Sequence, residues 1–196
     1  MSIKPRVAIL ISGRGSNMQA LIEAAQADRN YPAEIALVLS NKPDAAGLEI
    51  ARGLGVTALA VPAKDFGRDR EAHERALDAM LQDHKITIVC LAGYMRILTP
   101  WLVARWSGRM LNIHPSLLPA YKGLDTHARA LAAGETRHGC TVHLVTEGMD
   151  EGPILAQAEV PVLPGDTEDA LAARVLAEEH RLYPVALAEL SKAYFL

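Results

Sequence analysis

The chain has 196 residues, of which 50% are hydrophobic, and its formal net charge is −3. This length fits one domain, or one domain with an extension, and the hydrophobic share is enough to bury a substantial core. The charge gives no general attraction to nucleic acid or to an anionic membrane, so we expect neither as a partner, and the apolar stretch 7–11 is too short for a signal-peptide core or a membrane span.

Short apolar segments alternate with longer stretches of helical periodicity over the first hundred residues. The segments expected as strands are 6–12, 34–40, 56–61 and 86–93, and those expected as helices are 17–26, 45–55 and 69–84. This alternation predicts the α/β class, with a Rossmann-like, mostly parallel twisted sheet and helices on both of its faces.

The regular alternation of strand-like and helical segments ends after residue 108. We expect a strand at 109–114, a helix at 124–134, strands at 140–147 and 153–162, and a last helix from about 167 to 192. The tight segment EGMDEGP between the last two strands predicts an antiparallel addition to the sheet in the C-terminal part. No linker or repeat is visible, which predicts a single domain over 1–196.

The two cysteines, Cys90 and Cys140, lie far apart in apolar, strand-like segments. They form no C-x-x-C motif, so we expect reduced, buried thiols in a cytoplasmic protein.

A glycine-rich turn, ISGRGSNMQAL, follows the first expected strand. Gly13 and Gly15 allow a tight turn, and Ser16 or Asn17 can cap the next helix, so several backbone N–H groups would converge at its positive end. Such a turn can bind an anion. It is neither a complete dinucleotide fingerprint, because Met18 replaces the third glycine, nor a P-loop, and a plain strand-to-helix turn is the alternative.

A second polar feature, in the segment MLNIHPSLLP, lies where another expected strand ends. Asn112 and His114 are two positions apart and would point the same way, and Pro115 then stops the strand. The alternative is a satisfied surface pair. In a doubly wound sheet, however, ligands bind beyond the carboxyl ends of the strands, where the glycine-rich turn also lies.

A turn carboxylate could complete this set. Asp150 lies between Gly148 and Gly152, in a turn expected near solvent, and could pair with the imidazole of His114 and favour its charged form. An aspartate in a turn is more often structural.

Metal binding is not expected. His138 and His143 are five positions apart, so on a continuous strand they face opposite sides, and the sequence has no H-E-x-x-H motif or cysteine cluster.

Five segments of the sequence resemble a known enzyme family. The segments ISGRGSN, SNKPDAAGL, LAGYMRIL, NIHPSLLPAYKGLDTH and HGCTVHLVTEGMDEGPILAQ resemble the phosphoribosylglycinamide formyltransferases, folate-dependent enzymes of purine synthesis, over nearly the whole chain. NIHPSLLP and the downstream D-x-G-P also occur in methionyl-tRNA formyltransferase and formyltetrahydrofolate deformylase, whereas SGRGSN and GLDTH discriminate. Those two enzymes carry additional domains, which we do not expect in this chain.

The resemblance implies two substrates and a division of the domain. Residues 1–100 would form a phosphate-binding half, and residues 101–196 a catalytic and folate-binding half. Gly15, Ser16 and Asn17 would hold the phosphate of glycinamide ribonucleotide, and Glu179 would contact its ribose. Leu176 stands where some relatives have a polar side chain that contacts the ligand.

The second implied substrate is 10-formyltetrahydrofolate, the formyl donor. Arg70, or Arg68 in its place, would lie near the glutamate carboxylate of the folate. The other implied folate-binding residues are Met95, Arg96, Ile97, Leu98, Asn112, Thr146, Glu147, Gly148, Met149 and Asp150.

The implied reaction is direct attack of the acceptor amine on the formyl carbon, through a tetrahedral intermediate. Asn112 and His114 would donate hydrogen bonds to the oxygen that gains negative charge, and Asp150 would keep His114 charged and help to remove the amine proton. Neither a metal nor a covalent enzyme intermediate is required. The family also suggests that, of the two X-Pro bonds in this segment, Leu118–Pro119 is the cis one.

Two alternative functions, from other classes of protein, stay open. A nucleotide-dependent oxidoreductase is weakened by the missing third glycine and by the lack of a clearly placed acid after the second strand. A non-catalytic binder of a phosphorylated ligand would have no need of Asn112, His114 and Asp150 together.

The resemblance implies small-molecule substrates and either a monomer or a homodimer.

Overall fold

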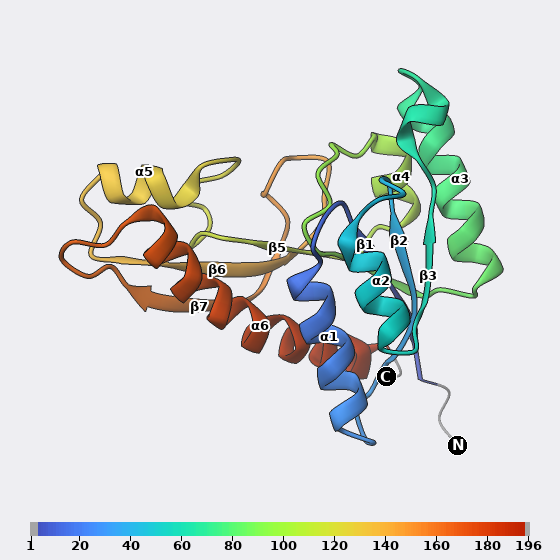
Figure 1. The fold of residues 1–196 in the computed structure, drawn as a ribbon, viewed down its shortest axis with the longest axis horizontal. Helices are drawn as coiled ribbons and strands as arrows, with labels where there is room; N and C mark the ends of the chain where they lie inside the picture. The colour runs from blue at the N-terminus through green and yellow to red at the C-terminus, as the bar shows by residue number, and fades with distance from the viewer. Residues whose placement is uncertain (1–3, 195–196) are drawn as a thin grey trace.

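A seven-stranded sheet in the order β3-β2-β1-β4-β5-β6-β7 runs through the computed structural model, which describes residues 4–194 (Figure 1). The first five strands in sequence pair in parallel, and β6 and β7 add to the sheet antiparallel. The expected mixed sheet with an antiparallel C-terminal part is therefore confirmed. The strands are β1 (Arg6–Ile11), β2 (Glu34–Ser40), β3 (Thr57–Ala60), β4 (Ile88–Leu91), β5 (Met110–His114), β6 (Arg137–Leu144) and β7 (Ile154–Pro161).

Six α-helices and one 3₁₀ helix surround the sheet in the described part of the chain. They are α1 (Ser16–Ala27), α2 (Ala46–Gly53), η1 (Ala63–Phe66), α3 (Arg70–Asp83), α4 (Pro100–Arg105), α5 (Thr126–Ala132) and α6 (Glu168–Ala193). The sequence pattern did not predict η1 or α4, because both are too short to show a helical repeat. The start of α4 is held by a residue far away in the sequence. The carboxylate of Glu74 in α3 accepts a hydrogen bond from the backbone N–H of Thr99, 2.8 Å away.

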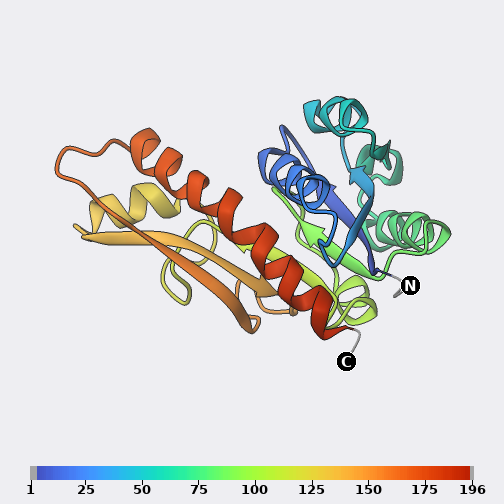
Figure 2. The same cartoon turned by 90° about the horizontal axis from the view of Figure 1, so that it is seen from below.

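Helices cover both faces of the sheet. Leu77 of α3 and Trp106, which follows α4, belong to a buried cluster on one face, whereas α1, α2 and α6 contribute to a cluster on the other. The central strand β1 is buried on both faces, as expected for a parallel strand between two helical layers. Figure 2 shows the long helix α6 running along β6 and β7 and reaching α1.

Helix α6 fixes the strand ends from which the polar site residues project. The hydroxyl of the fully buried Tyr183 donates to the carbonyl oxygens of Leu91 in β4, at 2.9 Å, and Leu111 in β5, at 3.2 Å. Asn112 follows directly after the second of these residues. The position of its backbone is therefore set by α6 as well as by the sheet.

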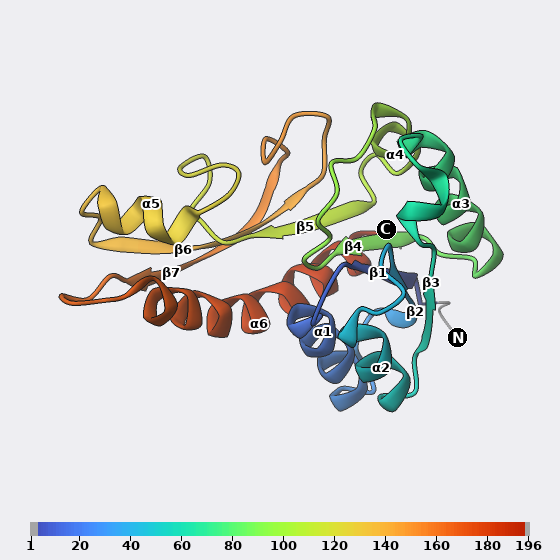
Figure 3. The ribbon, with the colours of Figure 1, turned by 45° about the horizontal axis from the view of Figure 1, so that its top comes forward.

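The strand order reverses between β1 and β4, so the loops after these strands diverge at the carboxyl edge of the sheet. The loop after β5 and the loop between β6 and β7 project in the same direction close to this edge (Figure 3). The Leu118–Pro119 bond is cis, and Cys90 and Cys140 are buried and free. None of the helices described is both long and apolar enough to cross a membrane.

Candidate active site

Strand β5 presents Asn112 and His114 on one face at its carboxyl end. The side chain of His114 is buried and that of Asn112 is half-buried. The pairing of β5 with β6 sets Asn112 opposite His143 and His114 opposite Thr141. The expected alignment of the two polar side chains follows from the alternation of side chains along a strand.

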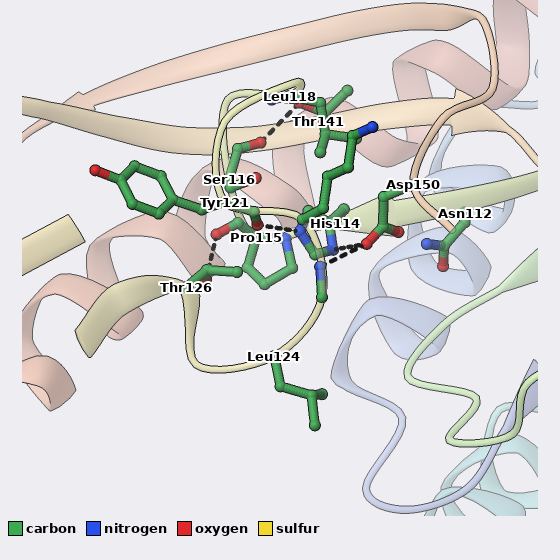
Figure 4. A network of polar contacts seen from close by, with 12 residues as sticks. Asn112, His114, Pro115, Ser116, Leu118, Tyr121, Leu124, Thr126, Thr141 and Asp150 are labelled. Atoms are coloured by element: carbon green, nitrogen blue, oxygen red, sulfur yellow. Dashed lines mark hydrogen bonds and ion pairs between the residues drawn. The ribbon is translucent and has the colours of Figure 1, made fainter. Parts of the chain in front are cut away.

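Both ring nitrogens of His114 face hydrogen-bond acceptors (Figure 4). Nε2 lies 2.9 Å from the carbonyl oxygen of Tyr121, and Nδ1 lies 3.5 Å from Oδ2 of Asp150. Since a carbonyl oxygen can only accept, Nε2 carries a hydrogen, and a second hydrogen on Nδ1 gives the carboxylate a donor. Hydrogens on both ring nitrogens would thus satisfy both acceptors, and the contact at Nδ1 is longer than the contact at Nε2.

Asp150 reaches His114 from the loop between β6 and β7. Its backbone has a positive φ of 54°, and its Oδ2 also accepts a hydrogen bond from the backbone N–H of Gly123, 2.9 Å away. The expectation of a carboxylate near solvent is wrong, because the side chain is only 10% exposed. Gly152 explains this burial, since a Cβ there would lie 1.7 Å from the carbonyl oxygen of Leu144, so only glycine lets the loop turn back this closely.

His143 is a member of the site that sequence reasoning missed. It is 3% exposed, and its Nε2 lies 3.3 Å from the amide nitrogen of Asn112 and 3.7 Å from Oδ1 of Asp150. Its Nδ1 lies 2.9 Å from the carbonyl oxygen of Leu144. Burial lowers the pKa of His143, the charge of His114 adds to this effect, and the Leu144 carbonyl and Asp150 oppose it.

His138, by contrast, lies in a separate contact with His127. Its Nε2 is 3.1 Å from Nδ1 of His127, and its pKa is lowered to about 4, chiefly by burial and then by His127. Within residues 4–194, no group of three or more His, Cys, Asp or Glu side chains could hold a metal ion.

A pocket of about 360 Å³ lies where the strand order reverses, between the loops after β1, β2 and β4. Its only charged lining residues are the cations Arg14 and Lys42, which sequence reasoning had not singled out. The full lining is Ser12, Gly13, Arg14, Gly15, Ser16, Asn17, Lys42, Ala92, Gly93 and Met95.

The glycine-rich turn leaves the start of α1 open toward this pocket. The expectation that Ser16 or Asn17 caps the helix is wrong, because Gly15 is the N-cap residue, with φ 70°, and no side chain caps the helix. No acidic residue lies in the first turn of α1. Gly47 of α2 holds the other side of the turn, since its N–H donates to the carbonyl oxygen of Gly13, 3.0 Å away. The N–H groups at the start of α1 thus remain available to an anion.

Asn17 and Glu179 meet beside the pocket. The amide nitrogen of Asn17 donates to Oε2 of Glu179 at 2.8 Å, and its buried Oδ1 finds no partner among the described residues. Burial raises the pKa of Glu179, and the hydrogen bond from Asn17 partly offsets this effect. Leu176 lies on α6 too, with a partly exposed side chain.

The loop after β4 brings exposed apolar side chains to the other side of the pocket. Met95 is 70% exposed and Ile97 is 66% exposed, while Arg96 and Leu98 are half-buried. Of the two candidate arginines, Arg70 contacts this loop, because its Nη1 donates to the carbonyl oxygen of Ile97 at 3.4 Å.

One further contact joins two of the loops around the pocket, and a separate loop carries Asp150. The backbone N–H of Met95 donates to Oγ of Ser12, 2.8 Å away, which joins the loop after β4 to the glycine-rich turn. Thr146, Glu147 and the apolar Met149 are exposed in the loop that carries Asp150, and Gly148 in the same loop is partly exposed.

The formyl transferase family model matches residues 5–187 of the chain. The phosphoribosylglycinamide formyltransferase of Escherichia coli (strain K12) is 46% identical over 181 residues, which cover 92% of this chain and 84% of that protein. The crystal structure of the phosphoribosylglycinamide formyltransferase from Brucella melitensis superposes with a TM-score of 0.92, at 57% identity and 96% coverage of both chains.

A longer relative contains a similar region. The trifunctional purine biosynthetic protein adenosine-3 of Drosophila melanogaster is 48% identical over 188 residues, which cover 95% of this chain. This chain spans only 14% of the length of that protein.

Proposed function

This chain belongs to the formyl transferase family, and we propose that it transfers the formyl group of 10-formyltetrahydrofolate to the amine of glycinamide ribonucleotide, in purine synthesis. The observation that carries the proposal is that Asn112, His114 and Asp150 lie at the same carboxyl edge of the sheet as a pocket whose only charged lining residues, within the described part of the chain, are cations. The bacterial relatives that are named phosphoribosylglycinamide formyltransferase support the choice of acceptor.

In this proposal the pocket at the start of α1 holds the phosphate of the acceptor. Gly15, Ser16 and Asn17 would supply backbone N–H groups at the positive end of the helix, with Arg14 and Lys42 adding charge. The hydroxyls of the ribose would meet the carboxylate of Glu179, which already accepts a hydrogen bond from Asn17.

The residues around the loop after β4 fit a folate. Exposed Met95 and Ile97 offer an apolar surface to aromatic rings, and Arg70, which begins α3 and donates to the carbonyl oxygen of Ile97, offers a cation to a glutamate carboxylate. The donor, when bound, supplies the formyl group. Arg96, Leu98 and the segment Thr146–Asp150 would complete its surroundings.

The geometry of the site suits stabilisation of a negative charge. Asn112 would donate through its amide, and His114 through Nδ1–H, to the formyl oxygen as it gains charge. The 3.5 Å separation from Asp150 is longer than an ordinary charge-assisted hydrogen bond, so Nδ1–H keeps donor capacity for that oxygen. Asp150 would keep the imidazole charged and accept a proton, directly or through water, from the amine nitrogen once it has bonded to the formyl carbon. The bond from that carbon to the folate nitrogen would then break, with the folate nitrogen leaving in protonated form.

A direct assay tests the proposal. Purified protein is incubated with 10-formyl-5,8-dideazafolate and glycinamide ribonucleotide, and the deformylated folate is measured with and without the acceptor. We expect turnover that requires the ribonucleotide. Turnover without any acceptor would indicate a deformylase, turnover only with formylatable tRNA would indicate the initiator enzyme, and no turnover at all would contradict the proposal.

A further inference from the structure

His143 faces the site with one nitrogen and the backbone with the other. Its Nδ1 lies 2.9 Å from the carbonyl oxygen of Leu144, and its Nε2 lies 3.3 Å from the amide nitrogen of Asn112. The two side chains are direct cross-strand neighbours on β5 and β6, so the sheet itself fixes their separation.

The carbonyl contact decides which tautomer the ring adopts. A carbonyl oxygen only accepts hydrogen bonds, so the hydrogen of the neutral ring belongs on Nδ1. Nε2 is then left with a lone pair, which can only accept. The group that faces this lone pair must therefore be a donor, and Asn112 can meet that condition only with its amide nitrogen, not its oxygen.

The same condition determines what Asn112 offers to the site. Figure 4 shows the amide nitrogen of Asn112 turned toward Asp150 and the amide oxygen turned away from it. An amide NH₂ group has two hydrogens, so one can bind His143 while the other stays available. A flipped amide would instead present its oxygen toward the carboxylate and toward the negative charge that develops in the reaction.

We infer that His143 is a positioning residue, whose Nδ1–H tautomer holds the amide of Asn112 in the orientation that donates to the formyl oxygen. This inference rests on the proposed function only for the identity of that oxygen. The orientation of the amide follows from the contacts of His143 alone.

The environment of His143 agrees with a neutral ring. The ionisable groups that face it are His114 and Asp150, and the ring is almost completely buried. A proton on Nε2 would oppose the N–H of Asn112 and would compete with His114 for Asp150. A neutral His143 thus leaves Asp150 to pair with the charge on His114.

The tautomer can be measured without any substrate. In the full chain labelled with ¹⁵N in the histidine rings, we expect His143 at neutral pH to show a protonated Nδ1 and an unprotonated Nε2, with the signals assigned by their loss in His143→Gln. A protonated Nε2, in either the other tautomer or the imidazolium, would overturn the inference. The result is independent of whether the protein formylates glycinamide ribonucleotide.

Two substitutions then test the consequence for catalysis. His143→Gln and His143→Leu both remove the ring N–H that binds Leu144, but only glutamine can place an acceptor oxygen opposite the Asn112 amide. We expect leucine to lower kcat at least about tenfold with little change in either substrate's Kd, and glutamine to recover most of the loss. Thermal unfolding of both variants shows that they are folded, and His84→Gln serves as a histidine control away from the site.

Either of two kinetic results would contradict the inference. An unchanged kcat in His143→Leu would mean that Asn112 needs no such partner. Equal losses in the leucine and glutamine variants would mean that the shape of the ring matters rather than its acceptor. A wild-type chain without formyl transfer would refute the proposed function instead, and the tautomer measurement would still decide the orientation of Asn112.

Discussion

Nδ1 of His114 lies 3.5 Å from Oδ2 of Asp150, although His114 ends strand β5 and Asp150 lies in the loop between β6 and β7. The same carboxylate oxygen accepts the backbone N–H of Gly123, in the loop that follows His114. The pair therefore forms only when both loops occupy their observed positions. Its geometry links the charge of the imidazole to the arrangement of the whole carboxyl edge of the sheet.

Arg14 and Lys42, the two cations that line the pocket at the start of α1, should matter only for a substrate that carries a phosphate. Arg14→Ala and Lys42→Ala should each raise the KM for glycinamide ribonucleotide about three- to tenfold, most strongly at low ionic strength, because each removes charge beside a dianion. Kinetic constants are compared with those for the dephosphorylated glycinamide riboside. The riboside should be affected much less, and equal losses on both substrates would argue against a phosphate contact.

Arg29→Ala is the matched control for this pair. It removes the same charge from the loop between α1 and β2, at the opposite end of α1 from the pocket. Its kinetic constants should stay at wild-type values.

The contacts of Arg70 distinguish it from Arg68 as the residue expected near the glutamate carboxylate of the folate. Arg70 donates to the carbonyl oxygen of Ile97, beside the exposed apolar side chains of the loop after β4. Arg70→Ala should raise the KM for the folate about fivefold, as expected for one exposed ion pair, whereas Arg68→Ala should change it less than about twofold. The reverse ranking in steady-state kinetics would transfer the role to Arg68.

Much of this arrangement follows from local pattern in the sequence. The alternation of apolar segments predicts the parallel part of the sheet, and the spacing of Asn112 and His114 predicts that they share a face. The Gly-flanked turn also predicts Asp150 as a partner of His114, and the structure brings the two side chains within 3.5 Å, with Asp150 more buried than a turn residue is expected to be.

Other features depend on contacts between distant segments. His143 faces Asn112 only because of the antiparallel register of β5 and β6, which no local pattern specifies. Helix α4 starts where Glu74 of α3 binds Thr99, and Asp150 is buried because Gly152 passes close to Leu144. Such contacts become visible only once the chain has folded.

The histidine pair next to the site predicts a loss of stability in acid. Burial, with a smaller effect of His127, lowers the pKa of His138 to about 4, below the value of about 6.5 for an exposed histidine. Between these two pH values the unfolded chain therefore binds a proton at His138 that the folded chain does not bind. The free energy of unfolding should therefore fall as the pH decreases from about 6.5 to about 4, and His138 should cause no further decrease below pH 4.

Urea unfolding at pH 7 and at pH 4.5 tests this prediction. His138→Gln removes the buried titration, so its free energy of unfolding should decrease less between the two pH values than that of the wild type. The same decrease in both proteins would show that other groups cause the acid sensitivity.

Asp150→Asn tests the central claim most directly. The asparagine keeps an oxygen that can accept the N–H of Gly123, but it loses the charge that stabilises the imidazolium of His114 and receives a proton. In formyl transfer from 10-formyl-5,8-dideazafolate to glycinamide ribonucleotide, we expect kcat to fall at least about a hundredfold, with much smaller changes in the Kd of either substrate and in Tm. A folded Asp150→Asn variant that retains more than about a third of the wild-type kcat would contradict the account and return Asp150 to a structural role in its loop.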